Sequence, residues 1–212
     1  MTQKPVLYGF DGSTYVRTVR IVLAEKGVDY EQVPVNVLEG EPRQPEHLAR
    51  HPFGKVPVLD IDGMRLLETA AIAEYLDESV EGGTRVRPSD PKDRARMRMV
   101  MGIIDSYGYG ALVGAAGFHL FPEFLGNPSQ ADHDAAADQA ELVLKTLMGI
   151  KGDDPWLAGA EPSLADFYLG PILFYVGLTP DADRLKAVPG VSDWWEKMAA
   201  HQNFKLTEPD LG

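Results

Sequence analysis

The fold of the first part of the chain is decided by residues 6–27, which have the sequence V-L-Y-G-F-D-G-S-T-Y-V-R-T-V-R-I-V-L-A-E-K-G. Residues 6–10 form a short apolar run that ends at Asp11-Gly12, which predicts a buried strand followed by a turn. From Ser13 onward, apolar residues recur on one broad helical face until Gly27, a typical helix stop. The hydrophobic period therefore changes from strand to helix within this stretch, and the predicted helix begins at Ser13.

The residues that follow continue a mixed pattern of strands and helices. Loose alternation predicts a second strand over residues 29–35, and a proline at its first position favours a short helical turn over residues 45–50. Two further strands, residues 56–61 and 64–67, are separated by Asp62-Gly63, which favours a tight hairpin turn. Glu68-Thr69 then opens a helix that ends near residue 79. The predicted order is strand, helix, strand, helix, hairpin, helix.

Strand patterns stop at a segment rich in glycine and proline. Beyond it, helical patterns cover residues 91–119, 129–149, 163–177 and 191–200. Ser163 and Asp166 fit a capping box at the start of the third of these helices. We therefore expect an α+β chain: an N-terminal domain at residues 1–80, a linker at 81–89 and an all-helical C-terminal domain at 90–212.

Composition limits the classes of partner. The formal net charge of −12 disfavours nucleic acids and anionic membranes, because both need clustered Lys and Arg. No stretch approaches the roughly 20 apolar residues of a membrane span, and the start lacks the order of a signal peptide. We expect a cytoplasmic protein with neither nucleic acid nor membrane as partner.

Sulfur chemistry and metal binding are also constrained. The chain contains no cysteine, so a thiol nucleophile must come from a ligand. His119 and His133 show no ligand spacing with other candidate residues, so no metal site is predicted.

Three local sequences, in this order and spacing, resemble the cytosolic glutathione S-transferase superfamily. They are S-T-Y-V-R-T-V-R from Ser13, P-F-G-K-V-P-V-L from Pro52 and L-E-T-A-A-I-A-E-Y-L from Leu67, and P-S-L-A-D-F from Pro162 adds a fourth match in the helical half. The resemblance is to bacterial, serine-type members of the phi-, theta- and zeta-like classes. It implies a thioredoxin-like N-terminal domain of order βαβ-α-ββα, with glutathione as co-substrate and no metal.

The resemblance implies a catalytic role for Ser13. Its hydroxyl, and the N–H groups of the helix it opens, would hold the thiol of glutathione as thiolate; Ser13 as a helix cap alone is the alternative. Tyr15, in the first helical turn, could line the glutathione pocket or donate a hydrogen bond to the thiol, as a second choice after Ser13. Tyr8 is more consistent with the core, because the tyrosine-using classes place their tyrosine where Gly9 stands here.

The other two motifs imply the remaining glutathione contacts. The backbone of Val56, next to a cis or trans Pro57, would pair with the cysteinyl part of the ligand. Glu68 and Thr69 would hold the γ-glutamyl end at a helix N-terminus. Arg43 and Lys55 are candidates for the glycine carboxylate, and each could equally be a solvated surface charge.

The electrophile site implied by the resemblance is aromatic. Its candidates are Phe10, Tyr107, Phe118 and Phe174, and each could instead be a core residue. Asp105 could reach the glutathione of a partner subunit in a homodimer. The expected activity is conjugation of glutathione to a small hydrophobic electrophile in detoxification; the alternatives are a glutathione-dependent isomerase or peroxidase, and a binding module without catalysis.

Overall fold

A computed structural model describes residues 4–210; residues 1–3 and 211–212, the outer ends of the two predicted domains, lie outside the described residues. The contacts divide the chain into two compact units, Met1–Val86 with Gln202–Gly212, and Arg87–His201. The segment from Gln202 onward thus groups with the first unit, whereas the sequence pattern places it with the helical part.

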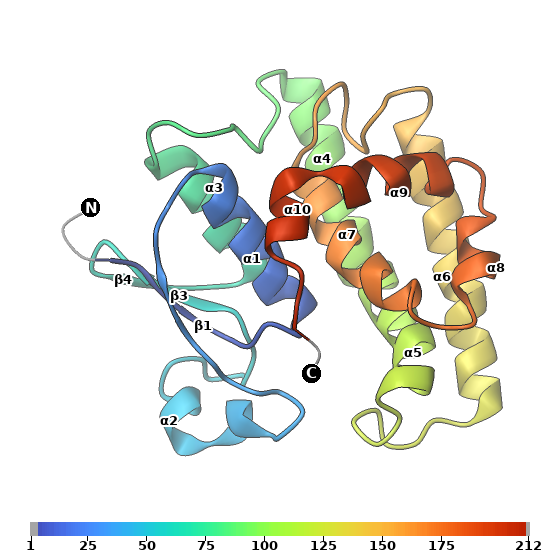
Figure 1. Cartoon of the computed structure of the whole chain (residues 1–212), viewed down its shortest axis with the longest axis horizontal. Helices are drawn as coiled ribbons and strands as arrows, with labels where there is room; N and C mark the ends of the chain where they lie inside the picture. Colours follow the sequence, from blue (N-terminus) through green and yellow to red (C-terminus); the bar gives the residue numbers. More distant parts are fainter. Residues whose placement is uncertain (1–3, 211–212) are drawn as a thin grey trace. The chain divides into compact units, whose positions relative to one another are not determined.

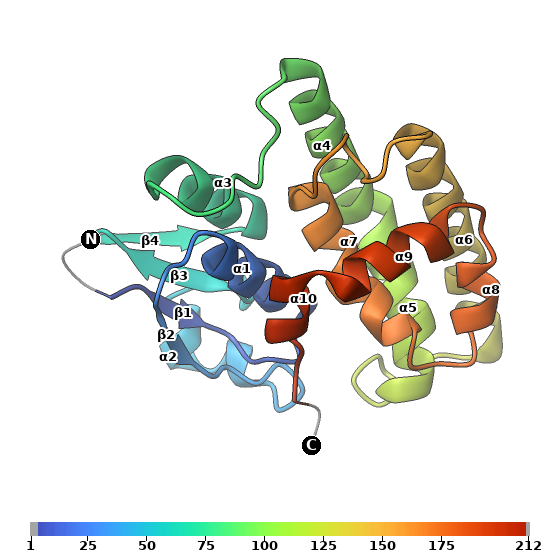
Figure 2. The same ribbon diagram turned by 45° about the horizontal axis from the view of Figure 1, so that its top comes forward.

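The first unit is a four-stranded sheet with helices on both faces. Figures 1 and 2 show α1 and α3 on one face of the sheet and α2 on the other. The sheet order is β2-β1-β3-β4, with β2 parallel to β1 and the other pairs antiparallel. This confirms the thioredoxin-like order. Its elements are β1 (Val6–Tyr8), α1 (Thr14–Glu25), β2 (Glu31–Val33), η1 (Glu41–Arg43), α2 (Pro45–Leu48), β3 (Val58–Ile61), β4 (Met64–Leu67) and α3 (Thr69–Ser79).

Strand polarity brings three chain segments to one edge of this sheet. Tyr8, the last residue of β1, pairs with Val58, the first residue of β3, and Val58 pairs with Leu67, the last residue of β4. The residues after β1, before β3 and after β4 therefore all leave the sheet at the same edge. That edge carries the residues of the three N-terminal motifs.

The strands are shorter than predicted at this edge. The strand predicted over residues 6–10 ends at Tyr8, and the one predicted from residue 56 begins at Val58. Gly9 has a φ of +152°, and a Cβ there would lie 2.3 Å from Val16 Cγ2. The chain turns away from the sheet at Gly9 because the backbone passes directly against α1.

A C-terminal helix, α10 (Gln202–Leu206), packs on α1 within the first unit. The buried Arg17 guanidinium donates to the Phe204 carbonyl at 2.9 Å and lies 3.9 Å from the centroid of the Phe204 ring. Asn203 Nδ2 donates to Glu25 Oε1 at 2.8 Å. The sequence analysis missed α10 because its stability comes from these long-range contacts.

The second unit is helical throughout its ordered elements, which confirms the predicted class. A π-helical segment joins its first two helices into one continuous stretch, and α8 is a short helix that the sequence analysis missed. The elements are α4 (Pro91–Ile103), η2 (Ile104–Gly108), α5 (Tyr109–Leu120), α6 (Gln130–Lys151), α7 (Leu164–Val176), α8 (Ala182–Lys186) and α9 (Val191–Ala200).

Helix α7 forms the centre of this unit and is buried along almost its whole length. Asp166 closes the predicted capping box: its Oδ2 accepts from the Ser163 N–H at 2.9 Å and from the Ser163 hydroxyl at 3.1 Å. Its Oδ1 accepts from Leu157 N–H and from Trp194 Nε1–H. The Asp166 carboxylate therefore has a structural role in capping α7 and tying it to two other segments.

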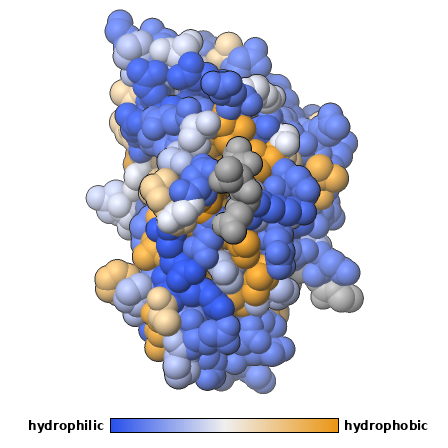
Figure 3. All heavy atoms as spheres, turned by 90° about the vertical axis from the view of Figure 1, so that its left-hand side faces the viewer, coloured by the Kyte–Doolittle hydropathy of each residue, from blue (hydrophilic) through white to orange (hydrophobic). Residues whose placement is uncertain are grey.

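Contrary to the expectation from sequence that no stretch approaches a membrane span, the continuous helical stretch Pro91–Leu120 is long and apolar enough to be one by length and composition, with a mean hydropathy of 1.2 over its best window. The core helix of a soluble protein meets the same criteria, and 44% of that window is buried inside the structure. On the face shown in Figure 3, hydrophobic side chains lie as patches among a larger number of hydrophilic ones.

Candidate active site

Ser13 is the N-cap residue of α1. Its backbone is extended, with φ −78° and ψ 124°, and its Oγ accepts a hydrogen bond from Val16 N–H at 3.4 Å. This bond uses an acceptor lone pair, so the hydroxyl hydrogen can still be donated to a ligand. The half-buried Ser13 can therefore cap the helix and donate a hydrogen bond at the same time.

The turn before Ser13 is compact. Ser13 N–H donates to the Phe10 carbonyl at 3.1 Å, and the Phe10 ring lies so close to Gly12 that a Cβ there would be 2.6 Å from it. Phe10 and Tyr15 are both half-buried on either side of Ser13. The Phe10 ring thus packs on the turn that leads to Ser13.

Tyr8 is not a core residue, contrary to the interpretation from sequence. Its side chain is half-buried, its hydroxyl donates to Asp60 Oδ2 at 3.3 Å, and the Arg50 guanidinium lies 4.5 Å from its ring centroid. The Tyr8 side chain is therefore bound in a charged cluster at the surface. Tyr8 is the last residue of β1, whereas Ser13 caps α1.

The segment before β3 is held in a defined shape. The Val56-Pro57 peptide bond is cis. Gly54 has a φ of +59°, and a Cβ there would lie 2.8 Å from the Pro42 carbonyl and 3.1 Å from Arg43 Cδ. The exposed Arg43 side chain thus lies over Gly54, next to the exposed Lys55. The structure thus brings Arg43, the last residue of η1, beside the loop that carries Lys55.

Two histidines to which the sequence analysis assigned no specific role support this loop. His47 is buried, and its Nε2 lies 2.8 Å from the Lys55 carbonyl oxygen. His51 is buried as well, and its Nδ1 accepts from Phe53 N–H at 3.3 Å. Burial lowers the pKa of His51, while the nearby Glu68 carboxylate opposes that shift. His47 and His51 hold the loop from inside, a role that only the folded contacts reveal.

Glu68 and Thr69 lie at the start of α3, as predicted. Glu68 is exposed and has φ 70° and ψ 121°, a strained backbone conformation for a residue with a side chain. Thr69 is buried as the first residue of the helix. Strain of this kind is a typical feature of functional sites, and here it fixes the direction of the chain at the helix start.

One sheet edge of the first unit therefore carries four features: the Ser13 hydroxyl at the N-terminus of α1, the N-terminus of α3, the two cations described above and the segment at Val56 that precedes β3. Among the described residues, the N–H and C=O of Val56 make no hydrogen bond. These groups together suit an extended, anionic, peptide-like ligand that pairs with the backbone.

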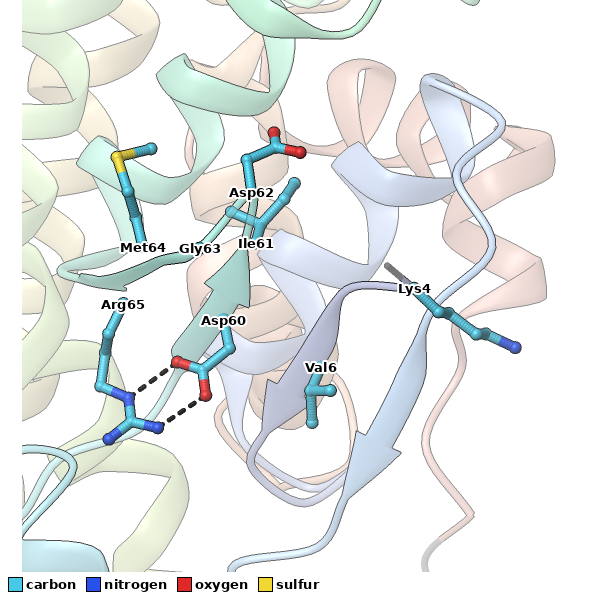
Figure 4. A pocket seen from close by; sticks show the side chains of 8 residues that line it. All are labelled: Lys4, Val6, Asp60, Ile61, Asp62, Gly63, Met64 and Arg65. Atoms are coloured by element: carbon cyan, nitrogen blue, oxygen red, sulfur yellow. Dashed lines mark hydrogen bonds and ion pairs between the residues drawn. The ribbon is translucent and has the colours of Figure 1, made fainter. Parts of the chain in front are cut away.

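A surface hollow of about 360 Å³ lies at the opposite end of the sheet, around the β3–β4 turn (Figure 4). Arg65 makes two hydrogen bonds to the Asp60 carboxylate on its wall, at 2.7 and 2.6 Å. The Arg65 side chain thereby lowers the pKa of Asp60. None of the predicted site residues lines this hollow.

The remaining predicted residues lie in the second unit, apart from Phe10 in the first. Asp105 and Tyr107 are exposed on η2, and Tyr107 is 62% exposed. Phe118 and Phe174 are half-buried on α5 and α7. Tyr107 and Phe118 are separated by about 16 Å along one helical stretch at 1.5 Å per residue. That these aromatic side chains share one electrophile pocket stays a prediction.

His119 and His133 show no ligand spacing in the sequence, and the structure places them side by side. Their ring centroids are 5.0 Å apart, and both Nε2 atoms lie close to the carboxylate of Asp181. The three residues are far apart in sequence, and the fold of the second unit brings them together.

Comparison with known families matches both units. The family described as "Glutathione S-transferase, N-terminal domain" matches residues 5–78, and "Glutathione S-transferase, C-terminal domain" matches residues 107–202. The first match contains all three N-terminal motifs.

Similar proteins and structures cover nearly the whole chain. Glutathione S-transferase 4 of Zea mays is 33% identical over 92% of this chain and 87% of its own length. Maleylacetoacetate isomerase of Pseudomonas aeruginosa is 34% identical over 96% of this chain and 95% of its own length. The crystal structure of glutathione transferase F7 from Populus trichocarpa has a TM-score of 0.86 at 31% identity, covering 96% of this chain and 97% of that one.

Proposed function

We propose, since the chain belongs to the glutathione S-transferase family, that it conjugates the thiolate of glutathione to small apolar electrophiles. In a substitution, the sulfur would form a bond to the electrophilic carbon while the leaving group departs with its electron pair; the thiol proton goes to solvent. The proposal rests on one observation. The chain leaves the sheet three times at one edge, and the segments there carry Ser13, Val56, and Glu68 with Thr69; Ser13 also caps α1.

Ser13 would activate the thiol. A free thiol of pKa about 8.5 is only a few per cent thiolate at neutral pH. Lowering that pKa by about two units requires about 2.7 kcal/mol of preferential stabilisation. A hydroxyl donor to a charged acceptor contributes roughly 1.5–3 kcal/mol, and a helix N-terminus adds about 0.3–1 kcal/mol. Ser13 offers both contributions from one position, which matches the requirement.

The rest of the edge would bind the peptide. Val56 would pair its free backbone groups with the cysteinyl part of glutathione. Thr69 and the start of α3 would hold the γ-glutamyl carboxylate, and Glu68 would accept from the α-ammonium. Arg43 and Lys55 would hold the glycine carboxylate, because Arg43 lies against Gly54, next to Lys55, and both side chains are exposed.

We assign the chain to the serine-type members of the family, acting in detoxification in the cytoplasm. Phe10, Tyr107, Phe118 and Phe174 are proposed for the electrophile site. Members of the family are typically dimers, and Asp105, exposed on η2, is proposed to contact the ligand of a partner subunit.

Two substitutions at Ser13 separate its two roles. Ser13→Gly removes the hydroxyl but retains a good N-cap residue, and Ser13→Thr retains both. With chlorodinitrobenzene as electrophile, we expect kcat/KM to fall by about 10–100-fold in Ser13→Gly, from the loss of one charged hydrogen bond. The pKa of bound glutathione, followed by thiolate absorbance, should rise by about one to two units in parallel. In Ser13→Thr, kcat/KM and the pKa of bound glutathione should stay close to the values of the parent protein.

Glutathione affinity serves as the control, because it depends mainly on the other edge residues; it should change by no more than a few fold. Unchanged turnover in Ser13→Gly would refute the assigned role. Failure of the parent protein to bind a glutathione column would instead favour a module without catalysis. Peroxidase activity is tested by adding an organic hydroperoxide to the same assay.

A second candidate reaction is glutathione-dependent cis–trans isomerisation. It is favoured by the 34% identity to the isomerase of Pseudomonas aeruginosa over 96% of this chain. The same thiolate would add to a double bond and leave again after rotation, so the reaction consumes no glutathione. Incubation with maleylacetoacetate decides between the two: isomerisation without loss of free thiol supports the second candidate.

A further inference from the structure

Three side chains outside the proposed glutathione site converge in the second unit. His119 belongs to the last turn of α5, His133 to the first turn of α6, and Asp181 precedes α8. Asp181 Oδ2 lies 2.8 Å from His133 Nε2 and 3.2 Å from His119 Nε2. All three ligand atoms lie within 4.8 Å of one another. We propose that His119, His133 and Asp181 form a binding site for a divalent transition-metal ion, with Zn²⁺ as the natural occupant.

The spacing fits a tetrahedral zinc ion with small adjustments. Zinc bonds of about 2.0–2.1 Å at tetrahedral angles place neighbouring ligand atoms about 3.3 Å apart. The two separations to Asp181, 2.8 and 3.2 Å, need to open by only a few tenths of an ångström. The third, between the two histidines, is no more than 4.8 Å and would have to reach the same spacing. Each imidazole would bind as the neutral ring with its proton on Nδ1: a proton on Nε2 moves through solvent to Nδ1, or is lost to solvent where both nitrogens carry one. The ion would take the place of the two hydrogen bonds to Asp181. Two imidazoles and one carboxylate leave the fourth position for water.

The groups around the cluster orient its ligands. His133 Nδ1 lies 3.1 Å from the Gln130 side-chain nitrogen and 3.4 Å from Asp134 Oδ1. Metal binding at Nε2 requires the ring proton on Nδ1, where it would be donated to the Asp134 carboxylate. The Gln130 amide nitrogen would then donate to Asp134 Oδ1 alone, which lies 2.8 Å away. The Phe118 ring lies against both imidazoles, with centroid distances of 5.1 Å to His119 and 4.5 Å to His133. The two rings are thus restricted in rotation before any ion binds.

Asp181 is fixed by its own backbone. Its N–H donates to Thr179 Oγ1 at 3.3 Å, and that hydroxyl donates to the Val176 carbonyl at 2.8 Å. The side chains of Asp181 and His133 are only 13% and 9% exposed, while that of His119 is 26% exposed. The site is therefore partly enclosed and open on the side of His119, where an ion can enter.

The local charge also favours a cation. Arg184, one turn beyond Asp181, is bound by Asp138 and Glu141. The positive charge of Arg184 is therefore paired with these two carboxylates. The Asp134 carboxylate lies beside His133 and adds negative charge next to the cluster. Figures 1 and 2 both show α8 beside α6. An ion at this point would join the ends of two long helices to the segment before α8, so its expected effect is to stabilise the helical unit.

The test uses the full chain, freed of any histidine tag and stripped of metal with a chelator. Zn²⁺ is titrated by calorimetry, and Co²⁺ is titrated as a spectroscopic probe of the same site. We expect one ion per chain, visible cobalt bands typical of low coordination number, and a rise in the unfolding temperature with Zn²⁺. His119→Ala and Asp181→Asn should each weaken Zn²⁺ binding at least tenfold and abolish the temperature shift.

Asp183→Asn is the matched control, because Asp183 is an exposed carboxylate two residues further on that supplies no atom to the cluster. It should bind Zn²⁺ within twofold of the parent chain. His119 is the most exposed ligand, so its alanine variant keeps the test valid if the Asp181 variant folds poorly; far-ultraviolet circular dichroism checks both. Absence of saturable one-to-one binding, or equal binding in the parent and His119→Ala, overturns the proposal.

Discussion

The buried capping box at the start of α7 predicts a large loss of stability on replacing Asp166 by Ala. The Asp166 carboxylate is fully buried and accepts four hydrogen bonds, of 2.9 and 3.1 Å from Ser163, 3.0 Å from Leu157 and 2.8 Å from Trp194. Alanine leaves the two backbone N–H groups and the indole N–H buried without an acceptor, at about 1–3 kcal/mol each. Part of this is offset, because burial raises the pKa of Asp166 and so makes its ionised form costly. We expect a net loss of about 3–5 kcal/mol.

The matched control is the other capping box of the second unit. Asp132 accepts from the Ser129 N–H at 2.9 Å and from the Ser129 hydroxyl at 2.7 Å, in the same pattern, but it is exposed to solvent. Water replaces its hydrogen bonds, so Asp132→Ala should cost clearly less stability than Asp166→Ala. Urea unfolding followed by circular dichroism, at one protein concentration, measures both values. If the two variants lose the same stability, burial does not set the cost and the reasoning is wrong.

Two further predictions concern the first unit. Gly9→Ala should destabilise the chain by about 2–5 kcal/mol, because a Cβ at 2.3 Å from Val16 Cγ2 and a φ of +152° both oppose a side chain there. Gly110→Ala, where no atom lies within 4 Å of the added Cβ, should be neutral or stabilising in the same urea unfolding experiment. Because burial lowers the pKa of His51 below 6.5, the unfolded chain takes up the proton first, and the stability that His51 contributes should fall as the pH drops below about 6.5. The free energy of unfolding, measured across that pH range, should fall less steeply in His51→Gln than in the parent chain. An equal slope in the two proteins would contradict a lowered pKa of His51 in the folded state.

Short sequence patterns correctly predicted the helices and strands on which most of the candidate site residues lie. Ser13 was predicted as a helix start from the change of period around it, and Asp62-Gly63 indicated the hairpin that brings Leu67 back beside Val58. Each of these signals comes from a few adjacent residues whose backbone preferences decide the local structure. They needed no knowledge of the rest of the chain.

The parts that sequence could not reveal depend on contacts between distant residues. His47 reaches the Lys55 carbonyl only after the loop between them has folded back. His119 and Asp181 are 62 positions apart, and no spacing rule connects them. Helix α10 is too short to form alone, and its position is given by Arg17 and Asn203. Such features follow from tertiary packing, which a single sequence does not encode in any local pattern.

The candidate glutathione site can nevertheless be traced to one geometric cause. Because β3 and β4 run antiparallel to their neighbours, the residues before β3 and after β4 must lie where β1 ends. The pairing of Tyr8 with Val58 and of Val58 with Leu67 aligns these ends without an offset. A shift of either pairing by one residue would turn β3 over, so that Val58 and Leu59 exchange sheet faces. The apolar side chains of Leu7, Leu59 and Ile61 hold the register by their burial, and in doing so they hold Ser13 and Val56 at one edge.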